Sequence, residues 1–172
     1  MNTVVTISGG GIIGNYISSR LSANNISTLV IEKNSDVLDL SENVRTVTLN
    51  QYSKNLIEKL GVSIPCSEIN EILVFDGEGS GKINFHSNDI DEENLSYVVF
   101  FNDLYRALQE KEKQRTIFGN QIEDIKENID GQICEVLLTN KDKIKSSFVA
   151  GCDGRNSNIA KLARLNINVS DY

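Results

Sequence analysis

Histidine and cysteine are scarce in this sequence, which contains His86 and three cysteines, Cys66, Cys134 and Cys152. An imidazole-based metal centre or a Ser-His-Asp triad would have to form around one ring, so neither is expected. The cysteines are odd in number, far apart and not arranged as Cys-x-x-Cys, which argues against both a disulfide framework and a zinc site. We therefore expect reduced, structural thiols and no metal.

Positive charge and long apolar runs are also in short supply. Seventeen basic residues stand against 24 acidic ones, giving a net charge of −7 and a pI near 4.8. Such a chain has no positive field to attract phosphate backbones, so we expect no nucleic-acid partner. No apolar run approaches the roughly 18–20 residues that cross a bilayer, and the N-terminus lacks the basic start of a signal peptide. We expect a cytoplasmic protein with at most peripheral contact with the inner membrane.

The composition is that of a folded protein. At 172 residues, 40% hydrophobic and 24% charged, the chain has room for one domain, or for one domain and part of another.

The first third of the sequence predicts a βαβ unit. Residues 4–7 read as a buried strand, Ile13, Ile17 and Leu21 give the following helix an apolar stripe with Ser18 and Ser19 facing away, and residues 27–31 read as a second strand.

The turn between this strand and helix carries the motif Gly-x-Gly-x-x-Gly at residues 9–14. Gly9 allows the tight turn, Gly11 leaves room for a pyrophosphate to approach the backbone, and Gly14 lets the helix pack closely on the strand. Amides near Ile12 and Ile13 would then point at phosphate oxygens. A purely structural glycine turn is the alternative.

Glu32 ends the second strand, 18 positions after Gly14. A carboxylate there can accept both hydroxyls of an adenosine ribose, and it would repel a ribose 2′-phosphate. The alternative is a plain surface acid.

A second candidate site lies where residues 147–152 run as a small and apolar strand into Asp153 and Gly154. In an open α/β sheet, ligands bind at the carboxyl ends of the strands, so Asp153 could reach ligand hydroxyls. The alternative is a turn that caps the last helix.

The remaining elements are predicted from periodicity and turn residues. We expect helices over residues 52–60 and 104–113 and from an N-cap at Asn156 or Ser157. We expect a hairpin of residues 72–75 and 82–85, a strand over 97–101, and an antiparallel meander of residues 117–125, 133–138 and 144–150.

With these motifs in view, the sequence resembles the FAD-dependent aromatic-ring hydroxylases and, within them, the ubiquinone-biosynthesis hydroxylases. The resemblance rests on the glycine motif with Glu32, on Arg-Thr-Val-Thr-Leu-Asn at residues 45–50, and on Phe-Val-Ala-Gly-Cys-Asp-Gly-Arg-Asn-Ser at residues 148–157. The last segment is similar to the family's Asp-Gly fingerprint, which is associated with FAD and NAD(P)H binding.

The resemblance implies a role for each matched residue. Gly9, Gly11, Gly14 and Glu32 would hold the ADP half of FAD, with the Ile13 amide at the phosphates. Arg45 would contact the flavin side, Ile122 would bring a backbone group to the adenine, and Asp153 would support the cofactor region. No catalytic side chain is assigned, because in this family the flavin carries the chemistry.

The implied fold is α/β: a three-layer, Rossmann-like FAD-binding domain of the glutathione-reductase type over residues 1–172, with an antiparallel β meander. A small inserted β segment at about residues 70–100 would belong to the substrate-domain region. Two departures from the family are expected. Asn102 stands where relatives usually place arginine or glutamine, and the sequence reaches Tyr172 before any Gly-Asp segment of the kind that binds the ribityl and phosphate portion of the flavin, which suggests a truncated chain or half of a split enzyme.

The implied function is the FAD-binding part of a monooxygenase of ubiquinone biosynthesis. It would hydroxylate a prenylated phenol with NAD(P)H and O₂, with a separate chain or other ubiquinone-biosynthesis proteins as possible partners. Two alternatives stay open: an inactive nucleotide-binding module and an NAD-dependent dehydrogenase domain.

Overall fold

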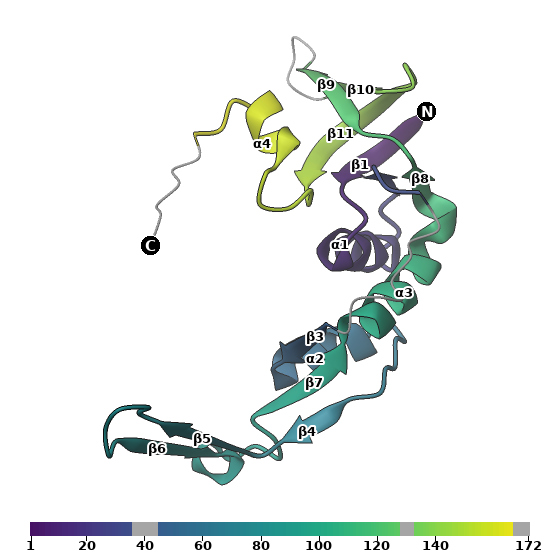
Figure 1. Ribbon diagram of the computed structural model, residues 1–172. Coiled ribbons are helices and arrows are strands. Elements are labelled where there is room, and N and C mark those ends of the chain that lie inside the picture. Colours follow the sequence, from purple (N-terminus) through teal and green to yellow (C-terminus); the bar gives the residue numbers. More distant parts are fainter. Residues whose placement is uncertain (36–44, 128–132, 167–172) are drawn as a thin grey trace. The chain divides into compact units, whose positions relative to one another are not determined.

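The computed structural model describes residues 1–35, 45–127 and 133–166, and the chain divides into two compact units (Figure 1). The first unit comprises Met1–Asp39 and Leu108–Tyr172, and the second comprises Leu40–Ala107. Helix α3 (Phe101–Glu112) begins in the second unit and ends in the first.

The first unit is built on a six-stranded sheet with the strand order β8-β2-β1-β11-β10-β9. The first four strands in this order are parallel, and β10 and β9 continue the sheet in antiparallel pairing. The strands are β1 (Asn2–Ser8), β2 (Thr28–Glu32), β8 (Thr116–Phe118), β9 (Ile122–Glu127), β10 (Cys134–Leu138) and β11 (Lys143–Gly151). The predicted βαβ unit is confirmed, and an antiparallel meander is present with β9, β10 and β11 as its strands.

Apolar side chains cover both faces of this sheet. On one face, Val5, Ile7 and Val30 pack with Ile17 and Leu21 of α1 (Ile12–Ser22). On the other face lies α4 (Asn158–Leu162), and the buried residues that pack there come from β2, β9, β10, β11 and α4: Ile31, Ile122, Val136, Leu138, Ile144 and Ile159. Neighbouring residues of β2 serve opposite faces because side chains alternate along a strand. The expected three-layer α/β architecture is confirmed.

The surface of α1 that faces the rest of the unit differs from the prediction. Ile13 is 62% exposed, whereas Ser18 and Ser19, expected to face solvent, are 0% and 3% exposed. Both hydroxyls donate hydrogen bonds to the carboxylate of Glu112, the last residue of α3, so they are satisfied although buried. The prediction that these serines face solvent was wrong, because the spacing of apolar residues in α1 carries no information about Glu112, a polar partner 93 residues away from Ser19.

The predicted strand over residues 117–125 is two strands. β8 pairs with β2 in parallel, and β9 pairs with β10 on the far edge of the sheet. Gly119 lies between them with φ of +67°, a backbone conformation that glycine adopts without a steric penalty. The chain therefore leaves the sheet at Gly119 and re-enters it at the opposite edge.

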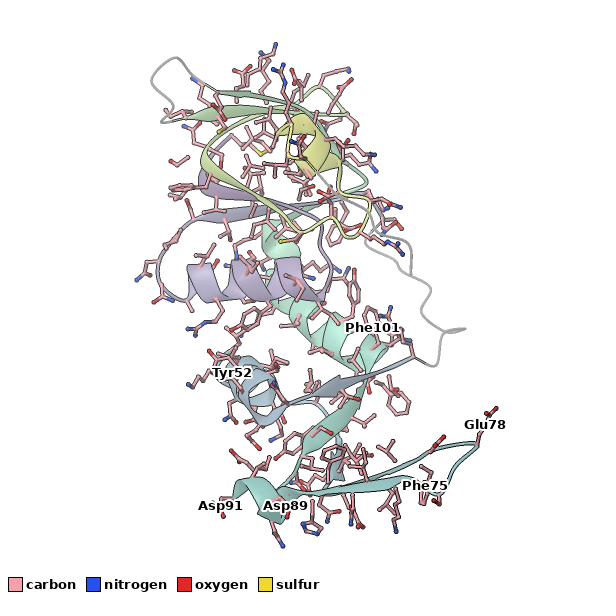
Figure 2. All side chains as sticks on the ribbon, turned by 90° about the vertical axis from the view of Figure 1, so that its left-hand side faces the viewer. Tyr52, Phe75, Glu78, Asp89, Asp91 and Phe101 are labelled. Atoms are coloured by element: carbon pink, nitrogen blue, oxygen red, sulfur yellow. The ribbon has the colours of Figure 1, made fainter. Side chains whose placement is uncertain are left out.

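The second unit contains two small sheets. One has the order β3-β7-β4 and the other is the hairpin of β5 and β6. Its elements are β3 (Thr46–Leu49), α2 (Gln51–Glu58), β4 (Ser67–Ile69), β5 (Glu71–Phe75), β6 (Lys82–His86), the 3-10 turn η1 (Ser87–Ile90) and β7 (Ser96–Phe100). The predicted hairpin is confirmed, and Figure 2 labels Phe75 on it and Glu78 in its turn.

One face of this hairpin is apolar. Ile72 pairs with Phe85 and Val74 pairs with Ile83, and all four side chains are 40% or more exposed. Residues that pair directly across two strands point to the same face, so these four form one patch.

Within the described residues, no helix is both long enough and apolar enough to span a membrane.

Candidate functional site: a cleft at the carboxyl ends of the parallel strands

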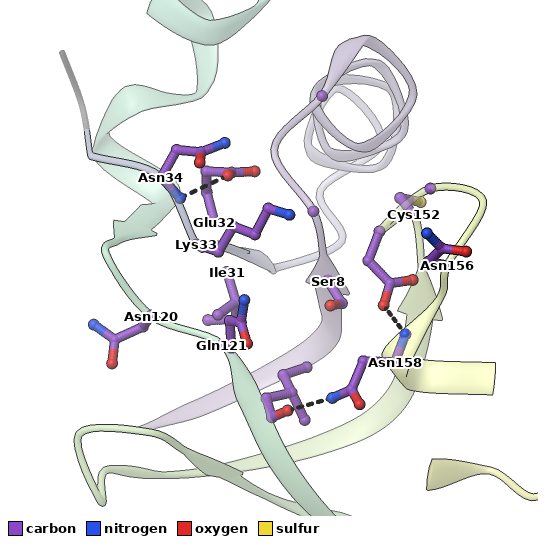
Figure 3. Close-up of a pocket in the computed structure, with 15 residues that line it drawn as sticks. Ser8, Ile31, Glu32, Lys33, Asn34, Asn120, Gln121, Cys152, Asn156 and Asn158 are labelled. Carbon is purple, nitrogen blue, oxygen red and sulfur yellow. Dashed lines mark hydrogen bonds between the residues drawn. The ribbon is translucent and has the colours of Figure 1, made fainter. Parts of the chain in front are cut away.

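A cleft of about 330 Å³ opens at the ends of β1, β2 and β11 (Figure 3). Its lining includes Gly9 and Gly11 after β1, Glu32 at the end of β2, and Asp153 and Gly154 after β11. From β1 the chain proceeds to β2 on one side, and β11 later adds on the other side. A ligand crevice is expected at such a switch point in an open α/β sheet.

The three glycines of the motif differ in what surrounds them. Gly9 has φ of +100°, and a Cβ there would lie 2.4 Å from the Cys152 carbonyl oxygen. A Cβ at Gly14 would lie 1.9 Å from the Gly9 carbonyl oxygen, so this glycine lets α1 pack closely on the turn. A Cβ at Gly11 would meet nothing within 4 Å. Gly9 and Gly14 are therefore required by packing, and the bare backbone of Gly11 faces the open cleft.

The N-terminus of α1 starts at this bare backbone. Gly11 is the N-cap and makes no side-chain capping bond, since it has no side chain. The first amides of an α-helix have no partners within the helix and carry a partial positive charge, which suits a phosphate. The Ile13 side chain is exposed, so the predicted contact of Ile13 with the phosphates concerns its backbone amide.

Glu32 is buried, with 6% of its surface exposed, and lines the cleft. Its Oε2 accepts a hydrogen bond from the Gly10 amide at 2.6 Å, and its Oε1 accepts one from the Asn34 amide at 2.8 Å. An ionised carboxylate offers about four acceptor positions, so two remain for ribose hydroxyls. Glu32 is thus not a plain surface acid, and its contact with a ribose stays a prediction.

Asp153 lies beside the cleft but its carboxylate is occupied by α4. It accepts hydrogen bonds from the Ser157 hydroxyl at 2.6 Å and from the amides of Asn158 and Ile159 at 2.6 and 3.1 Å. Burial alone would raise the pKa of Asp153, but these hydrogen bonds outweigh it and hold the pKa below its ordinary value. Asp153 therefore stabilises the start of α4, and a role toward the cofactor region would act through that helix.

Asn158 is a residue that sequence reasoning missed. Its Nδ2 donates to the carbonyl oxygen of Ile122 at 2.9 Å, while its own amide is held by Asp153, as Figure 3 shows. Asn158 therefore links the Asp-Gly segment to the strand expected beside the adenine. The Ile122 carbonyl accepts this one bond and keeps a second lone pair, so both the carbonyl and the amide of Ile122 are candidates for contact with a base. The single asparagine after a serine N-cap gave no signal of this link.

The lining of the cleft is rich in polar side chains. It includes Lys33, Asn34, Asn120, Gln121, Asn156 and Asn158. Cys152 also lines it, and burial and the nearby Asp153 raise the pKa of this thiol, so it stays neutral at physiological pH. Among the described residues, no group of three or more histidine, cysteine, aspartate or glutamate side chains is arranged to hold a metal.

Arg45 belongs to the second compact unit. Its guanidinium carbon lies 4.7 Å from the centre of the Phe101 ring, and its carbonyl accepts the Phe101 amide at 2.8 Å. The side chain is exposed apart from this cation–π contact. Its predicted contact with the flavin side of the cofactor stays a prediction.

The residues around the cleft fit an adenosine diphosphate group. Gly11 leaves space that any side chain would fill, the α1 N-terminus supplies positive charge beside it, and Glu32 keeps free acceptor positions. The fold and this cleft define a dinucleotide-binding domain of the Rossmann-like kind.

Comparison with known proteins assigns the family. The model of the family described as "FAD binding domain" matches residues 2–171, and the chain belongs to this family. It is 32% identical over 167 residues to Monooxygenase 1 of Arabidopsis thaliana, which covers 94% of this chain and 41% of the relative. It is 25% identical over 186 residues to the mitochondrial ubiquinone biosynthesis monooxygenase COQ6 of Caenorhabditis elegans, with 96% and 41% covered.

Solved structures agree on the fold. PqsL of P. aeruginosa in complex with 2-aminobenzoylacetate superposes with a TM-score of 0.82 at 19% identity, over 100% of this chain and 48% of PqsL. The chain thus spans less than half the length of the relatives it matches. The protein described here is a member of the FAD-binding domain family, and the predicted fold class and the cofactor FAD are both supported.

Proposed function

We propose that this chain is the FAD-binding part of a flavin-dependent monooxygenase that hydroxylates a prenylated phenol ring in ubiquinone biosynthesis. NAD(P)H would serve as the reductant and O₂ as the oxygen source. The observation that carries the cofactor assignment is the open backbone of Gly11 facing the same cleft as Glu32. The match to the nematode COQ6 protein over 96% of this chain supports the substrate class.

The residues of the chain would have separate tasks. Gly11 and the first amides of α1 would bind the pyrophosphate, Glu32 would accept the ribose hydroxyls, and the backbone at Ile122 would face the adenine. Arg45 would contact the flavin side. When bound, the flavin supplies the electron transfer and oxygen activation, and the protein orients it.

This chain spans less than half the length of its relatives. We propose that a counterpart of the part it does not span, in the same or in a separate polypeptide, completes the pocket for the polyprenyl phenol. The long isoprenoid tail of such a substrate would bring the complete enzyme to a membrane surface as a peripheral protein.

Cofactor binding is tested first, on the chain itself. The purified protein is titrated with FAD, ADP and NADH while flavin fluorescence and heat release are recorded. Binding of FAD, with ADP as a competitor, supports the proposal. Binding of NADH without FAD would favour the dehydrogenase alternative, and ADP binding without FAD would favour a nucleotide-binding module.

The reaction is tested on the complete protein. Oxygen and NAD(P)H consumption are measured with a prenylated phenol and with the same phenol lacking the prenyl chain, and the product is identified by mass. Hydroxylation that is faster with the prenylated ring supports the proposed substrate class. Equal rates with both rings, or hydroxylation of the bare ring alone, would contradict it.

A further inference from the structure

Asn15 lies in the first turn of α1, one position after the glycine motif. Its side chain is buried, with 1% of its surface exposed. Its Nδ2 donates a hydrogen bond to the carbonyl oxygen of Gly10 at 2.7 Å. Its own backbone amide donates to the Gly11 carbonyl at 3.0 Å, so this one residue holds two consecutive carbonyls of the turn.

The hydrogen bond to Gly10 fixes the direction of the next amide. In a trans peptide the C=O of one residue and the N–H of the next point in opposite directions, and the structure contains no cis bond among its described residues. Because the Gly10 carbonyl is directed to the buried Asn15 side chain, the Gly11 N–H points away from it. Gly11, unlike Gly10, lines the cleft.

This peptide unit would otherwise be easy to turn over. It lies between two glycines, and glycine can adopt backbone angles on both sides of the Ramachandran plot at little cost. A flipped peptide would direct the Gly10 carbonyl oxygen into the cleft, where its negative charge would repel a pyrophosphate. The Gly10 residue is held at both ends, since its amide donates to Glu32 and its carbonyl accepts from Asn15.

An asparagine side chain at position 15 is unfavourable for the stability of the fold in two respects. Asparagine is a poorer helix former than leucine. Within the described part of the chain, its buried Oδ1 has no hydrogen-bond partner. An apolar side chain of similar size would avoid both costs, so the bond to Gly10 is the interaction that offsets them.

We propose that Asn15 is a positioning residue that locks the Gly10–Gly11 peptide with its N–H directed at the pyrophosphate of the bound dinucleotide. The inference rests on the proposed function, because it assumes that the cleft binds this group. It goes beyond the glycine motif, since a buried side chain outside the motif sets the orientation of the amide.

The test compares two ligands that differ only in the diphosphate. Affinities of the wild-type chain and of Asn15→Leu for ADP and for adenosine are measured by calorimetry. Leucine keeps the number and branching of the side-chain heavy atoms and improves helix propensity, and a thermal melt checks that the variant is folded. We expect ADP affinity to fall roughly tenfold, the usual consequence of losing one well-aimed hydrogen bond to a charged group, with adenosine affinity unchanged.

Ser19→Ala is the matched control. It removes a buried hydrogen bond from the same helix, the one to Glu112, without touching the turn. We expect a lower melting temperature and an unchanged ratio of ADP to adenosine affinity. A second readout is the amide resonance of Gly11, which should shift when ADP is added to wild type and shift less in Asn15→Leu.

The outcomes distinguish failure of the Asn15 positioning role from failure of the proposed function. An unchanged ADP affinity in Asn15→Leu, or an equal loss for ADP and adenosine, overturns the positioning role while the proposed function stands. If wild type binds neither ligand, the cleft is not a nucleotide site and both conclusions fail.

Discussion

The carboxylate of Glu32 accepts the amide of Gly10 at 2.6 Å, which ties the end of β2 to the glycine turn after β1. The acid that the sequence suggests for the ribose is therefore also a structural part of the phosphate turn. Its second oxygen holds the Asn34 amide at 2.8 Å. A change at Glu32 should consequently affect folding as well as binding, and the two effects can be separated by the substitution chosen.

Glu32→Gln should lower both stability and adenosine affinity. Both Glu32 oxygens accept backbone N–H groups, and the glutamine Nε2 would have to face one of these donors, leaving it unsatisfied. We expect the free energy of unfolding to fall by about 1–3 kcal/mol. Chemical denaturation and adenosine titration measure the two effects.

Glu123→Gln is the control for this change, since Glu123 is exposed and pairs with Lys141 at the surface. Its stability should change by no more than about 0.5 kcal/mol. A Glu32→Gln variant that is as stable as this control would contradict the role of Glu32 in holding the turn.

Gly11→Val should weaken binding strongly while the chain stays folded. The backbone of Gly11 is extended, with φ of −72° and ψ of −173°, which valine adopts readily, and a Cβ there meets nothing within 4 Å. The side chain would occupy the space for the pyrophosphate, so FAD and ADP affinity should fall about tenfold or more. Calorimetry and a thermal melt on the same sample check both statements.

Gly14→Ala is the opposite case in the same motif. Its Cβ would lie 1.9 Å from a backbone oxygen of Gly9, so α1 must move away from the turn. We expect a loss of about 1–3 kcal/mol or more of stability, as in other overpacked sites. If Gly11→Val destabilises the chain as much as Gly14→Ala does, the space beside Gly11 is not open to a side chain.

The sequence predicts local features of this protein well and long-range polar contacts poorly. The glycine turn, the strands around it and the hairpin follow from patterns within about 15 residues, because backbone geometry and alternation are local. The burial of Ser18 and Ser19 depends on Glu112, and the engagement of the Ile122 carbonyl depends on Asn158, 36 residues away. Nothing in a local pattern indicates that such side chains will meet.

The division of residues 117–125 into two strands is a second feature that the local sequence does not predict. The apolar residues of this segment suit a strand throughout, and the single Gly119 could be read as a bulge. Its positive φ instead carries the chain from one edge of the sheet to the other. Which edge a strand joins is decided by tertiary packing, and this choice determines that Ile122 comes to lie in the lining of the cleft.

Asp153→Ala should loosen the start of α4. The carboxylate accepts three hydrogen bonds from Ser157, Asn158 and Ile159, and their loss should cost about 1–2 kcal/mol, the range measured for helix caps. Amide hydrogen exchange in α4 should become faster, and Asn158 should hold Ile122 less firmly. Asp142→Ala, in an exposed turn, is the control. Unchanged exchange in α4 would show that Asp153 does not support this helix.

Glu112 should make the stability of the protein depend on acid pH. Its side chain is fully buried, and it accepts hydrogen bonds from Ser18, Ser19 and Arg115. Burial alone would raise the pKa of Glu112, but the bonds from Arg115 and the two serines outweigh it and lower the pKa below the ordinary 4.5. A carboxyl whose pKa is lower in the folded state than in the unfolded state stabilises the fold fully at pH values above its unfolded-state pKa. That contribution is lost as the pH falls through its folded-state pKa.

The test is the difference in unfolding free energy between wild type and Glu112→Gln, measured in urea at pH 7, 5, 4 and 3. At pH 7 the variant should be less stable by about 2–4 kcal/mol, because its amide would place a donor against buried hydroxyls and Arg115. Below pH 4.5 the difference should shrink, since protonation gives the wild-type carboxyl one donor as well. Glu135→Gln, at an exposed pair with Lys143, should show little difference at any of these pH values. A gap for Glu112→Gln that stays constant from pH 7 to 3 would mean that the buried carboxylate does not titrate with folding.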